Sequence, residues 1–347
     1  MSICAVTKEE KASWDDLIAK NPDGGSVFQS VEFAQIKQKA GWQPRFLKTE
    51  DSVYFLALER KVPLVGKVWY VPGGPGIVDY TDIASFSKDL KAYIASNFKN
   101  VFSAKIEPAV VKEAEDAPSL PGVEPTRPIQ PNANTVIIDT SKPNDELLAS
   151  FNQSARRYIR KGYKDGIEVR PVDCSDQNCQ LAYDLYKSTS EGRFFIRSRD
   201  YHIGYWKLFA DKQLGQMFFA YHEDKVVAAA YINFIGANAL YKDGASVRQK
   251  VSQGASYVLQ WEICRWLHDH GVKNYDLHGT PPAKSIGDKT HPKYGLGLFK
   301  TGFNKQITEY VGAYNIIIAD RRGWLWNRYL ERIFQALYFR IKKQAWY

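Results

Sequence analysis

Apolar and polar positions follow the same succession of helical and extended patterns twice along the chain. In the first half, the periodicity predicts helices at 9–20, 30–39 and 83–97, and strands at 42–50, 52–62, 67–74 and 101–107. In the second half, it predicts helices near 144–164, 176–190, 199–212 and 254–270, and strands at 215–222, 225–235, 237–243 and 274–279. The repetition lies in the order of the elements and not in the residues. It predicts a mixed α/β fold with two similar domains.

Capping and breaking residues mark several ends of these elements. Thr7, with Glu10 three residues later, forms a capping-box pattern for the first helix. Residues 108–134 contain six prolines and are the most linker-like part of the chain, which predicts a long loop before a strand at 135–140. The C-terminal stretch 322–343 has the pattern of one long amphipathic helix.

Composition fits this picture and locates the charge. The chain has 347 residues, of which 44% are hydrophobic and 24% charged, so wholesale disorder is excluded and about two domains are expected. The net charge is +9. Residues 151–170 and 319–347 together account for all of this excess. Two local basic stretches predict two contacts with anionic partners rather than a generally cationic protein.

Several classes of protein are disfavoured by what the chain lacks. Its four cysteines are too few for a disulfide framework, and their spacing does not suit a zinc site, so we expect no metal. The N-terminal residues become charged early and show no apolar signal-peptide core. The sequence holds no run of apolar residues long enough for a spanning helix. We therefore expect a cytoplasmic protein.

One segment combines a strand, a loop and a helix in the manner of an anion site. The strand is expected to end near Asp243, the loop holds Gly244 and Gly254, and the helix is expected to start near Ser256. Backbone N–H groups at a helix N-terminus can bind a phosphate. GNAT acetyltransferases hold coenzyme A there with a denser glycine pattern. The segment therefore indicates either a GNAT-type scaffold without its coenzyme site or an ordinary strand–loop–helix unit.

Two further segments carry residues suited to an active site. Arg197 and Tyr201 are four residues apart and would share one helix face, where they could bind a phosphate or carboxylate. Lys300 lies between two aromatic residues in the glycine-spaced segment 294–303, where it could balance an oxyanion. The alternatives are a surface arginine beside a core tyrosine and a solvated loop lysine.

Together these segments resemble the FemABX family of non-ribosomal peptidyltransferases, which build the cross-bridges of peptidoglycan. The matching pieces, spread over nearly the whole chain, are FQSVEFAQIKQKAGW (28–42), YVPGGPGI (70–77), NTVIIDT with SARRYIRKGYKDGIEV (134–169), FFIRSRDY (194–201), LYKDGAS (240–246), YDLHGT (275–280) and GLFKTGFN (297–304). The resemblance implies two GNAT-like domains, with the C-terminal helix returning to the first. On this basis we expect residues 1–142 with 312–347 to form one domain and 143–311 the other. Sustained heptads are missing from the sequence, so the chain resembles the compact members without a coiled-coil arm.

The resemblance also implies a reaction and its partners. An aminoacyl-tRNA would donate its amino acid as co-substrate, and no other cofactor is implied. The acceptor would be a side-chain amine on the stem peptide of a peptidoglycan precursor, either UDP-MurNAc-peptide or lipid II. An ester is already activated, so a positioned neutral amine needs mainly proximity and oxyanion stabilisation. We expect a monomer. The rival functions are an acyl-coenzyme A acyltransferase on the same scaffold, and a non-catalytic protein that binds tRNA or a membrane.

The implied site residues fall in three groups. Lys37 and Arg197 match basic residues that hold the precursor's phosphates, and Tyr201 matches a tyrosine of the same site. Phe299 and Lys300 match a Phe-Lys pair near the acceptor end of the tRNA, and form the catalytic pair. Either Tyr241 or Asp243 falls where the family has a site tyrosine, and the sequence does not fix the register.

The match departs from the family's pattern in two places. Ala109 stands where a tyrosine often follows a proline, and His278 stands where a glycine is frequent. Either Asp243 or Asp276 could accept the proton of the attacking amine.

The basic stretches have candidate partners of their own. The stretch beginning at 154 could lie near the tRNA or the precursor, or could simply be a solvated helix face. The C-terminal helix carries Trp326, Ile333 and Ile341 on one stripe, which suits closure of the first domain. It also suits shallow adsorption at the inner leaflet of the cell membrane, with Trp346 and Tyr347 projecting.

Overall fold

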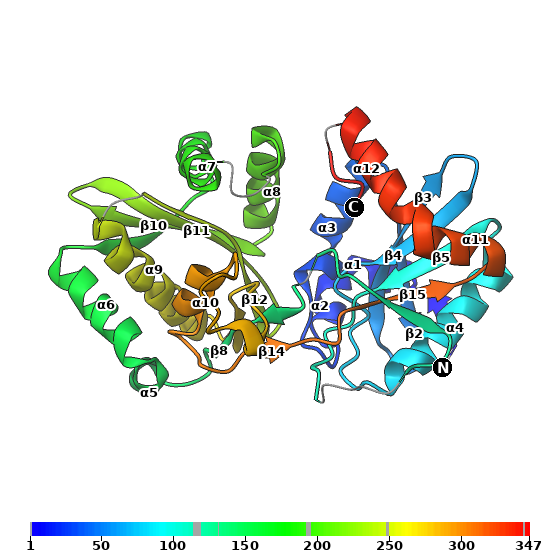
Figure 1. Ribbon diagram of the computed structural model, residues 1–347, viewed down its shortest axis with the longest axis horizontal. Coiled ribbons are helices and arrows are strands. Elements are labelled where there is room, and N and C mark those ends of the chain that lie inside the picture. Colours follow the sequence, from blue (N-terminus) through cyan, green and yellow to red (C-terminus); the bar gives the residue numbers. More distant parts are fainter. Residues whose placement is uncertain (1, 114–118, 131, 192–195, 248–249, 343) are drawn as a thin grey trace. The chain divides into compact units, whose positions relative to one another are not determined.

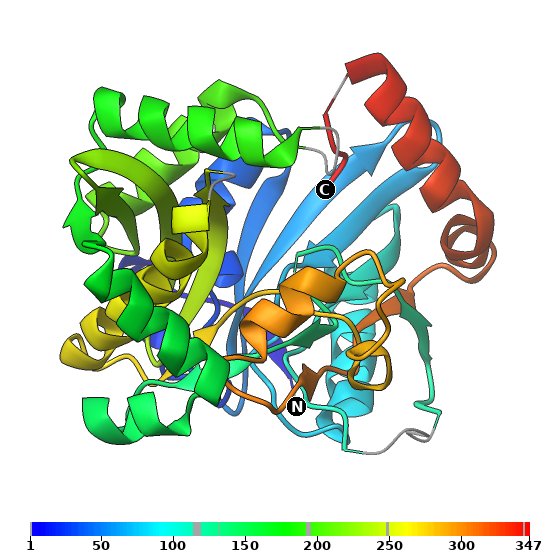
Figure 2. The same cartoon turned by 60° about the vertical axis from the view of Figure 1, so that its left-hand side comes forward.

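The chain forms two compact units, which Figures 1 and 2 show in ribbon form. The computed structural model describes residues 2–113, 119–130, 132–191, 196–247, 250–342 and 344–347. One unit comprises residues 1–133 and 310–347, and the other residues 134–309. Residues 194–195 and 248–249, which belong to segments used in the sequence analysis, lie outside the described residues.

The first unit is built on a mixed sheet. Its strand order is β1-β2-β3-β4-β5-β15-β6, antiparallel except for the parallel pair β4–β5. The strands are β1 (Ile3–Ala5), β2 (Gln43–Thr49), β3 (Tyr54–Val62), β4 (Gly66–Val71), β5 (Val101–Ile106), β15 (Ala313–Ile317) and β6 (Val123–Thr126). β6 forms within the stretch predicted to be a long loop, because it pairs with β15.

Helices cover both faces of this sheet. They are α1 (Lys8–Ala12), α2 (Trp14–Ile18), the 3₁₀ turn η1 (Val27–Gln29), α3 (Val31–Lys39), α4 (Asp82–Asn97), α11 (Asp320–Leu325), the π-turn η3 (Trp326–Leu330) and α12 (Glu331–Lys342). Neighbouring residues of a strand point to opposite faces. Trp69 packs in the apolar cluster that includes α4, whereas Tyr70 contacts Trp42 and Tyr347 on the other face.

The second unit repeats this architecture. Its main sheet has the order β8-β13-β12-β11-β10-β9, antiparallel except for the parallel pair β12–β13. The strands are β8 (Ile137–Asp139), β13 (Asn274–Asp276), β12 (Asn238–Ser246), β11 (Lys225–Ile235), β10 (Gly215–His222) and β9 (Glu168–Val172), with a separate small pair of β7 (Asn134–Thr135) and β14 (Thr308–Glu309). In both units an antiparallel meander leads through one helix, α4 or α9, to a parallel strand. The duplication predicted from element order is therefore a duplication of topology.

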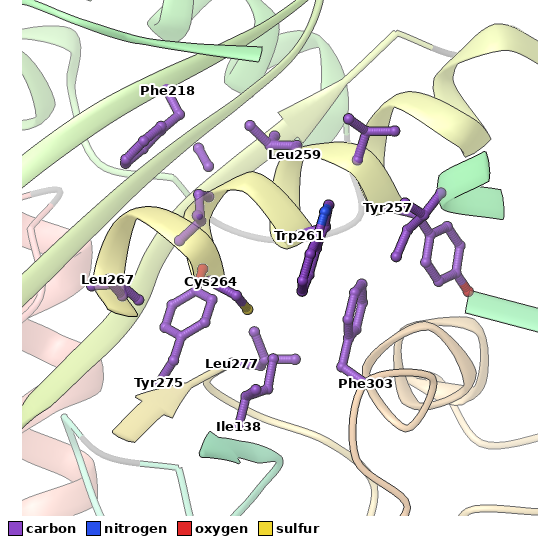
Figure 3. Close-up of a cluster of buried hydrophobic side chains, with 14 of the residues drawn as sticks. Ile138, Phe218, Tyr257, Leu259, Trp261, Cys264, Leu267, Tyr275, Leu277 and Phe303 are labelled. Carbon is purple, nitrogen blue, oxygen red and sulfur yellow. The ribbon is translucent and has the colours of Figure 1, made fainter. Parts of the chain in front are cut away.

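The helices of the second unit form layers on the two faces of its sheet. They are α5 (Asn144–Ser150), α6 (Gln153–Lys164), α7 (Asp176–Ser190), α8 (Arg199–Asp211), α9 (Lys250–Asp269), η2 (Ala283–Ser285) and α10 (Tyr294–Lys300). Figure 1 shows α7 and α8 over one face, with α9 and α6 on the other. Figure 3 shows the core under α9, where Trp261, Cys264 and Leu267 point toward Tyr275 and Leu277. The longest described helix of this unit, α9, lies in this packed layer, so the described residues contain no coiled-coil arm.

Local structure departs from the predicted elements where packing breaks a pattern. The predicted helix 144–164 is two helices, because Phe151 and Asn152 are extended and the Asn152 side chain caps α6. The predicted strand 135–140 is divided between β7 and β8, which belong to different sheets. Residues 294–300 of the segment 294–303 form a helix, α10, in place of the flexible glycine-spaced segment that was predicted.

The C-terminal helix is also divided. The π-turn η3 separates α11 from α12, and Trp326 is buried whereas Ile333 and Ile341 are exposed. The predicted single stripe therefore does not pack as one face. Trp346 and Tyr347 do not project, because both are buried. Among the described residues, no helix has the length and apolar character needed to cross a bilayer.

Candidate active site

The structure places most predicted site residues in the second unit, in two groups around strand β12. Tyr231 of β11 pairs with Asp243, whereas the next residue, Ile232, pairs with Tyr241, so Lys242 forms a β-bulge. The bulge turns the side chains of Tyr241 and Asp243 toward different layers. Tyr241 packs against the core that contains α9, and Asp243 contacts α8. The register that the sequence left open is thus fixed by one extra residue.

Asp243 is the centre of the first group. Its side chain is 6% exposed, and Oδ2 accepts a hydrogen bond of 2.9 Å from Trp206 Nε1 and lies 3.7 Å from His202 Nδ1. Lys242 Nζ lies 3.4 Å from Oδ1. Burial alone would raise the pKa of Asp243, but Lys242, His202 and Trp206 outweigh it and hold this pKa well below its usual range. Asp243 is therefore a stable anion and a poor proton acceptor.

His202 is a residue that the sequence analysis missed. It lies in α8 between Asp243 and the rings of Tyr183, Tyr186 and Tyr201. Its Nε2 is buried and has no hydrogen-bond partner among the described residues. The apolar stripe of the predicted helix includes position 202, so a buried histidine could have been found from periodicity alone.

Arg197 and Tyr201 are brought together as predicted, although not on one helix face. Arg197 precedes α8, whose N-terminus is capped by Ser198, and its Cζ lies 4.6 Å from the centre of the Tyr201 ring. The backbone oxygen of Arg197 accepts a hydrogen bond of 3.5 Å from the Tyr183 hydroxyl.

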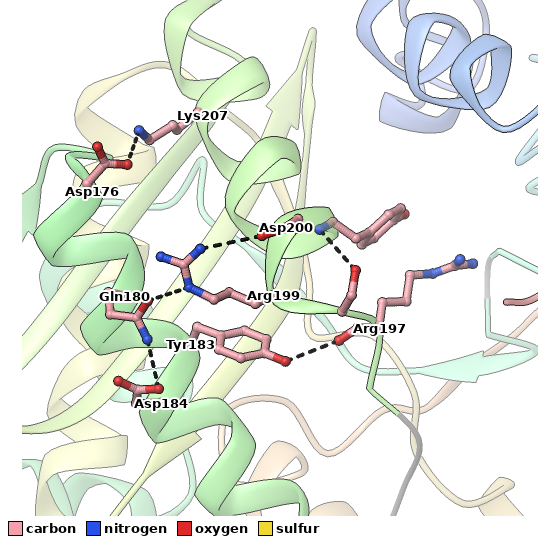
Figure 4. A network of polar contacts seen from close by, with 10 residues as sticks. Asp176, Gln180, Tyr183, Asp184, Arg197, Arg199, Asp200 and Lys207 are labelled. Atoms are coloured by element: carbon pink, nitrogen blue, oxygen red, sulfur yellow. Dashed lines mark hydrogen bonds and ion pairs between the residues drawn. The ribbon is translucent and has the colours of Figure 1, made fainter. Parts of the chain in front are cut away.

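Figure 4 shows that Arg197 and Arg199 lie in different environments. The side chain of Arg197 points away from the polar network on α7. Arg199, two residues later, is held inside that network by Gln180 at 2.5 Å and Asp200 at 3.4 Å.

Lys300 is the centre of the second group. Its side chain ends α10 and is 3% exposed, and Nζ donates hydrogen bonds to the carbonyl oxygens of His278 (2.6 Å) and Gly279 (2.8 Å). Burial lowers the pKa of Lys300 to about 7, and the negative charge of Asp276 opposes this shift. An amine whose pKa lies near 7 is present at that pH in both its protonated and its neutral form. It can therefore donate a proton to a reacting group or accept one from it.

The loop after β13 shapes this environment. His278 has φ of 56° and Gly279 has φ of 88°, so the chain curls and directs two carbonyls at Lys300. Asp276 Oδ1 accepts hydrogen bonds from Thr135 Oγ1 at 2.5 Å and from the His278 N–H at 2.6 Å. Burial raises the pKa of Asp276. A left-handed backbone at 278 is the physical reason why a glycine would suit this position.

Phe299 and Tyr241 are aromatic residues at the apolar core of the second unit. The Phe299 ring contacts Tyr257 edge-on at 4.9 Å and Phe303 at 5.4 Å. Burial and the Asp243 charge raise the pKa of Tyr241, so its hydroxyl stays protonated. Tyr241 and Phe299 both pack against the core cluster of α9.

Lys37 is the one predicted site residue that belongs to the first unit. It lies on α3, is buried, and its Nζ is 5.0 Å from the centre of the Phe33 ring. Elsewhere in this unit, burial raises the pKa of two carboxyl groups, that of Asp15 to about 7 and that of Asp23 to about 6.

The loop and helix start that were predicted to form an anion site are wrong in position. Helix α9 begins at Lys250, so Gly254 and Ser256 lie inside it. A side chain at Gly254 would meet the Cα of Gly162 at 3.0 Å. Gly254 therefore permits close packing of α9 against α6. Among the described residues, no cluster of three histidine, cysteine or acidic side chains has the geometry of a metal site.

Comparison with known proteins covers nearly the whole chain. Residues 149–290 match the model of the acetyltransferase (GNAT) domain. The aminoacyltransferase FemB of Staphylococcus epidermidis (strain ATCC 12228) is 23% identical, over 88% of this chain and 93% of that protein. A lipid II:glycine glycyltransferase of S. epidermidis (strain RP62A) is 21% identical, over 87% and 90%.

Comparison with solved structures supports the fold. The crystal structure of FemX superposes with a TM-score of 0.76 at 19% identity, and covers 94% of this chain and 99% of that one. Two GNAT-like units with a returning C-terminal helix are thereby confirmed. The predicted resemblance and the predicted enzyme class, a transferase, are confirmed by the names of the relatives. Over nearly its whole length the chain is similar to aminoacyltransferases of the FemABX type, and it shares their two-unit GNAT fold.

Proposed function

We propose that this enzyme transfers an amino acid from aminoacyl-tRNA to the side-chain amine of a stem peptide on a peptidoglycan precursor, either UDP-MurNAc-peptide or lipid II. The observation that carries the chemistry is the environment of Lys300, a buried amine held by two carbonyls with a pKa of about 7. The names of the full-length relatives, an aminoacyltransferase and a lipid II:glycine glycyltransferase, support the substrate class.

In the proposed reaction, the acceptor amine attacks the ester carbonyl of the aminoacyl-tRNA. A carbon–nitrogen bond forms, the ester carbon–oxygen bond breaks, and the tRNA hydroxyl leaves with a proton. An ammonium has three donors, and Lys300 uses two of them for His278 and Gly279, which leaves one for the developing oxyanion. Phe299, the preceding residue, would pack beside the acceptor end of the tRNA.

The attacking amine must lose its proton, and the two candidate acceptors differ. Asp243 is held as a low-pKa carboxylate, which disfavours it as a base. Burial raises the pKa of Asp276 and so strengthens it as a base. We therefore assign proton transfer to Asp276, and assign to Asp243 the task of holding Trp206 and His202 in place.

The anionic part of the precursor needs cationic partners. Arg197, stacked on Tyr201, would bind a phosphate through its guanidinium fork, and Lys37 would bind one as a point charge. Tyr241 would border the reacting groups.

The rival function is transfer of an acyl group from coenzyme A. The packing role of Gly254 inside α9 removes one glycine from the expected phosphate loop, which favours the tRNA-dependent reaction. The test incubates the enzyme with a mixed pool of charged tRNAs and with both precursor forms, followed by mass spectrometry of the products. A precursor heavier by one amino acid supports the proposal and identifies residue and acceptor. Tight binding of coenzyme A with acyl transfer, and no tRNA-dependent product, would establish the rival.

A further inference from the structure

The C-terminal helical segment carries an exposed apolar ridge. Five residues spaced four apart, running from α11 through η3 to α12, are between 43% and 73% exposed: Leu325, Tyr329, Ile333, Leu337 and Ile341. Residues four apart form a continuous row on a helix surface. Trp324 is 50% exposed at the start of this row. Large apolar side chains gathered on one exposed helix indicate an interaction surface.

The buried side of the same segment explains why the ridge is left outside. Trp326 packs edge-on against Phe102 of the sheet at 5.4 Å, and Glu331 pairs with Lys105 at 2.7 Å. Tyr347 donates a hydrogen bond of 2.5 Å to Glu331. These contacts fix the buried face of the helix with few aliphatic side chains, so the aliphatic ridge is not needed for closing the unit.

An arginine row lies directly beside the apolar ridge. Arg328, Arg332 and Arg340 occupy the adjacent four-residue row, and all three are exposed. None of them forms an ion pair with a described residue. The only acidic residue between them, Glu331, is buried and already paired. The exposed face is thus apolar and cationic together.

The surface continues into a groove at the N-terminal end of the helix. The groove has a volume of about 660 Å³, and Trp324, Arg321 and Lys91 line it together with Glu124. Its size and its two cations suit a phosphate-bearing headgroup next to an aromatic side chain.

The second basic helix of the chain provides a contrast. In α6 the apolar residues Ala155 and Ile159 are buried, and Gly162 lies against Gly254 of α9, so its cations sit on a solvated face without an apolar ridge. Charge alone does not distinguish the two helices. Only the C-terminal one presents apolar and cationic rows side by side.

We propose that the face formed by α11, η3 and α12 docks on the surface of an anionic lipid bilayer. An interfacial helix buries an apolar row at the headgroup boundary while neighbouring arginines contact anionic headgroups. A protein partner would need carboxylates in register with the arginine row, whereas a bilayer surface presents anionic groups at any spacing. Docking is independent of the proposed reaction, because it needs neither tRNA nor precursor.

The test measures binding of the full chain to vesicles of phosphatidylcholine mixed with phosphatidylglycerol, and to vesicles of phosphatidylcholine alone, by co-sedimentation. Wild-type protein should bind the mixed vesicles and lose binding at high salt. The double variant Ile333→Glu with Leu337→Glu should weaken binding by more than about tenfold. The double variant Arg328→Gln with Arg332→Gln should weaken it by about fivefold for each arginine.

Two matched controls make the result specific. Arg157→Gln with Arg160→Gln removes the same charge from α6 and should leave vesicle binding unchanged. Leu64→Glu places the same acid at another exposed apolar position of the first unit and should also be silent. If the Glu pair does not fold, Ile333→Ser with Leu337→Ser replaces it.

Three outcomes would overturn the proposal. Wild-type protein that ignores the mixed vesicles would do so, as would ridge variants that bind like wild type. The third is a sedimentation coefficient that falls in the ridge variants without vesicles, because the ridge would then be a surface between copies of this chain.

Discussion

Lys105 of the first unit and Lys300 of the second are both buried, and the two ammonium groups are stabilised in different ways. Lys105 in the first unit is 5% exposed, and its ammonium contacts the Glu331 carboxylate at 2.7 Å and lies 5.3 Å from the Tyr347 ring. Lys300 in the second unit is 3% exposed, and its described hydrogen-bond partners are two backbone carbonyls. A carboxylate neutralises the first charge, whereas carbonyl dipoles only partly compensate the second. Lys105 therefore holds α12 on the sheet through an ion pair, whereas Lys300 can lose its proton near neutral pH.

The largest expected effect is on the stability of the first unit. Lys105→Met leaves the buried Glu331 without its cationic partner, with the Tyr347 hydroxyl still donating to it. This change should lower the free energy of unfolding by about 3–5 kcal/mol, as measured by urea titration. The double variant Lys105→Met with Glu331→Leu removes both charges and should recover most of this loss. If the single variant loses less than about 1 kcal/mol, the pair does not hold α12 on the sheet in the way we describe.

The matching change in the second unit should act on activity. Lys300→Met should lower the rate of aminoacyl transfer by about 100-fold to 1,000-fold, because one oxyanion donor is lost. Lys300→Gln retains donors for the two carbonyls but not the charge, and it should be similarly inactive. Lys289→Met removes an exposed charge from the loop before the same helix and should stay near wild type. An active Lys300→Gln variant would limit Lys300 to ordering the loop at 276–280.

A third test extends the contrast to the arginines before and inside α8. Arg197→Ala should weaken precursor binding by about 10-fold to 100-fold in titration calorimetry, since a charge-assisted contact is lost. It should change tRNA binding much less. Arg199→Ala is the matched control, because Arg199 is already engaged by Gln180 and Asp200. Equal losses for precursor and tRNA would contradict the assignment of Arg197.

The sequence predicts those features that depend on local pattern and on motif order. The capping box of Thr7 and Glu10 is present, and α8 begins at Arg199 as its periodicity indicates. The sequence could not predict features created by long-range pairing. The bulge at Lys242 depends on β11, and it separates Tyr241 from Asp243.

Lys300 illustrates the same limit. Its glycine-spaced surroundings predict a flexible segment, but two of these glycines make close contacts inside the fold. A side chain at Gly297 would meet Ile286 at 2.6 Å, and one at Gly302 would meet the Phe299 carbonyl at 2.9 Å. Here the glycines allow the helix and its terminal lysine to be buried. The local sequence alone does not distinguish glycines that permit close packing from glycines that make a segment flexible.

The smallest expected effect is a shift in the pH dependence of the transfer rate, which tests the electrostatic environment of Lys300. If the charged form of Lys300 is active, the transfer rate should fall as pH rises through about 7. Asp276→Asn removes the assigned proton acceptor and should lower the transfer rate at every pH. In the activity that remains, loss of the Asp276 charge should lower the pKa of Lys300 and move this fall to lower pH by up to about one unit. Asp145→Asn, an exposed change in the same unit, should leave the profile in place.

The same shift has a consequence for stability with a definite sign. The folded pKa of Lys300 lies below its ordinary value of 10.5, so between about pH 7 and 10.5 the unfolded chain binds more protons than the folded one. As pH rises through this window, the free energy of unfolding of the wild type should therefore increase relative to that of Lys300→Met. Urea titrations at several pH values measure this difference. A constant difference would mean that burial does not depress the pKa of Lys300, and the electrostatic contrast with Lys105 would then be lost.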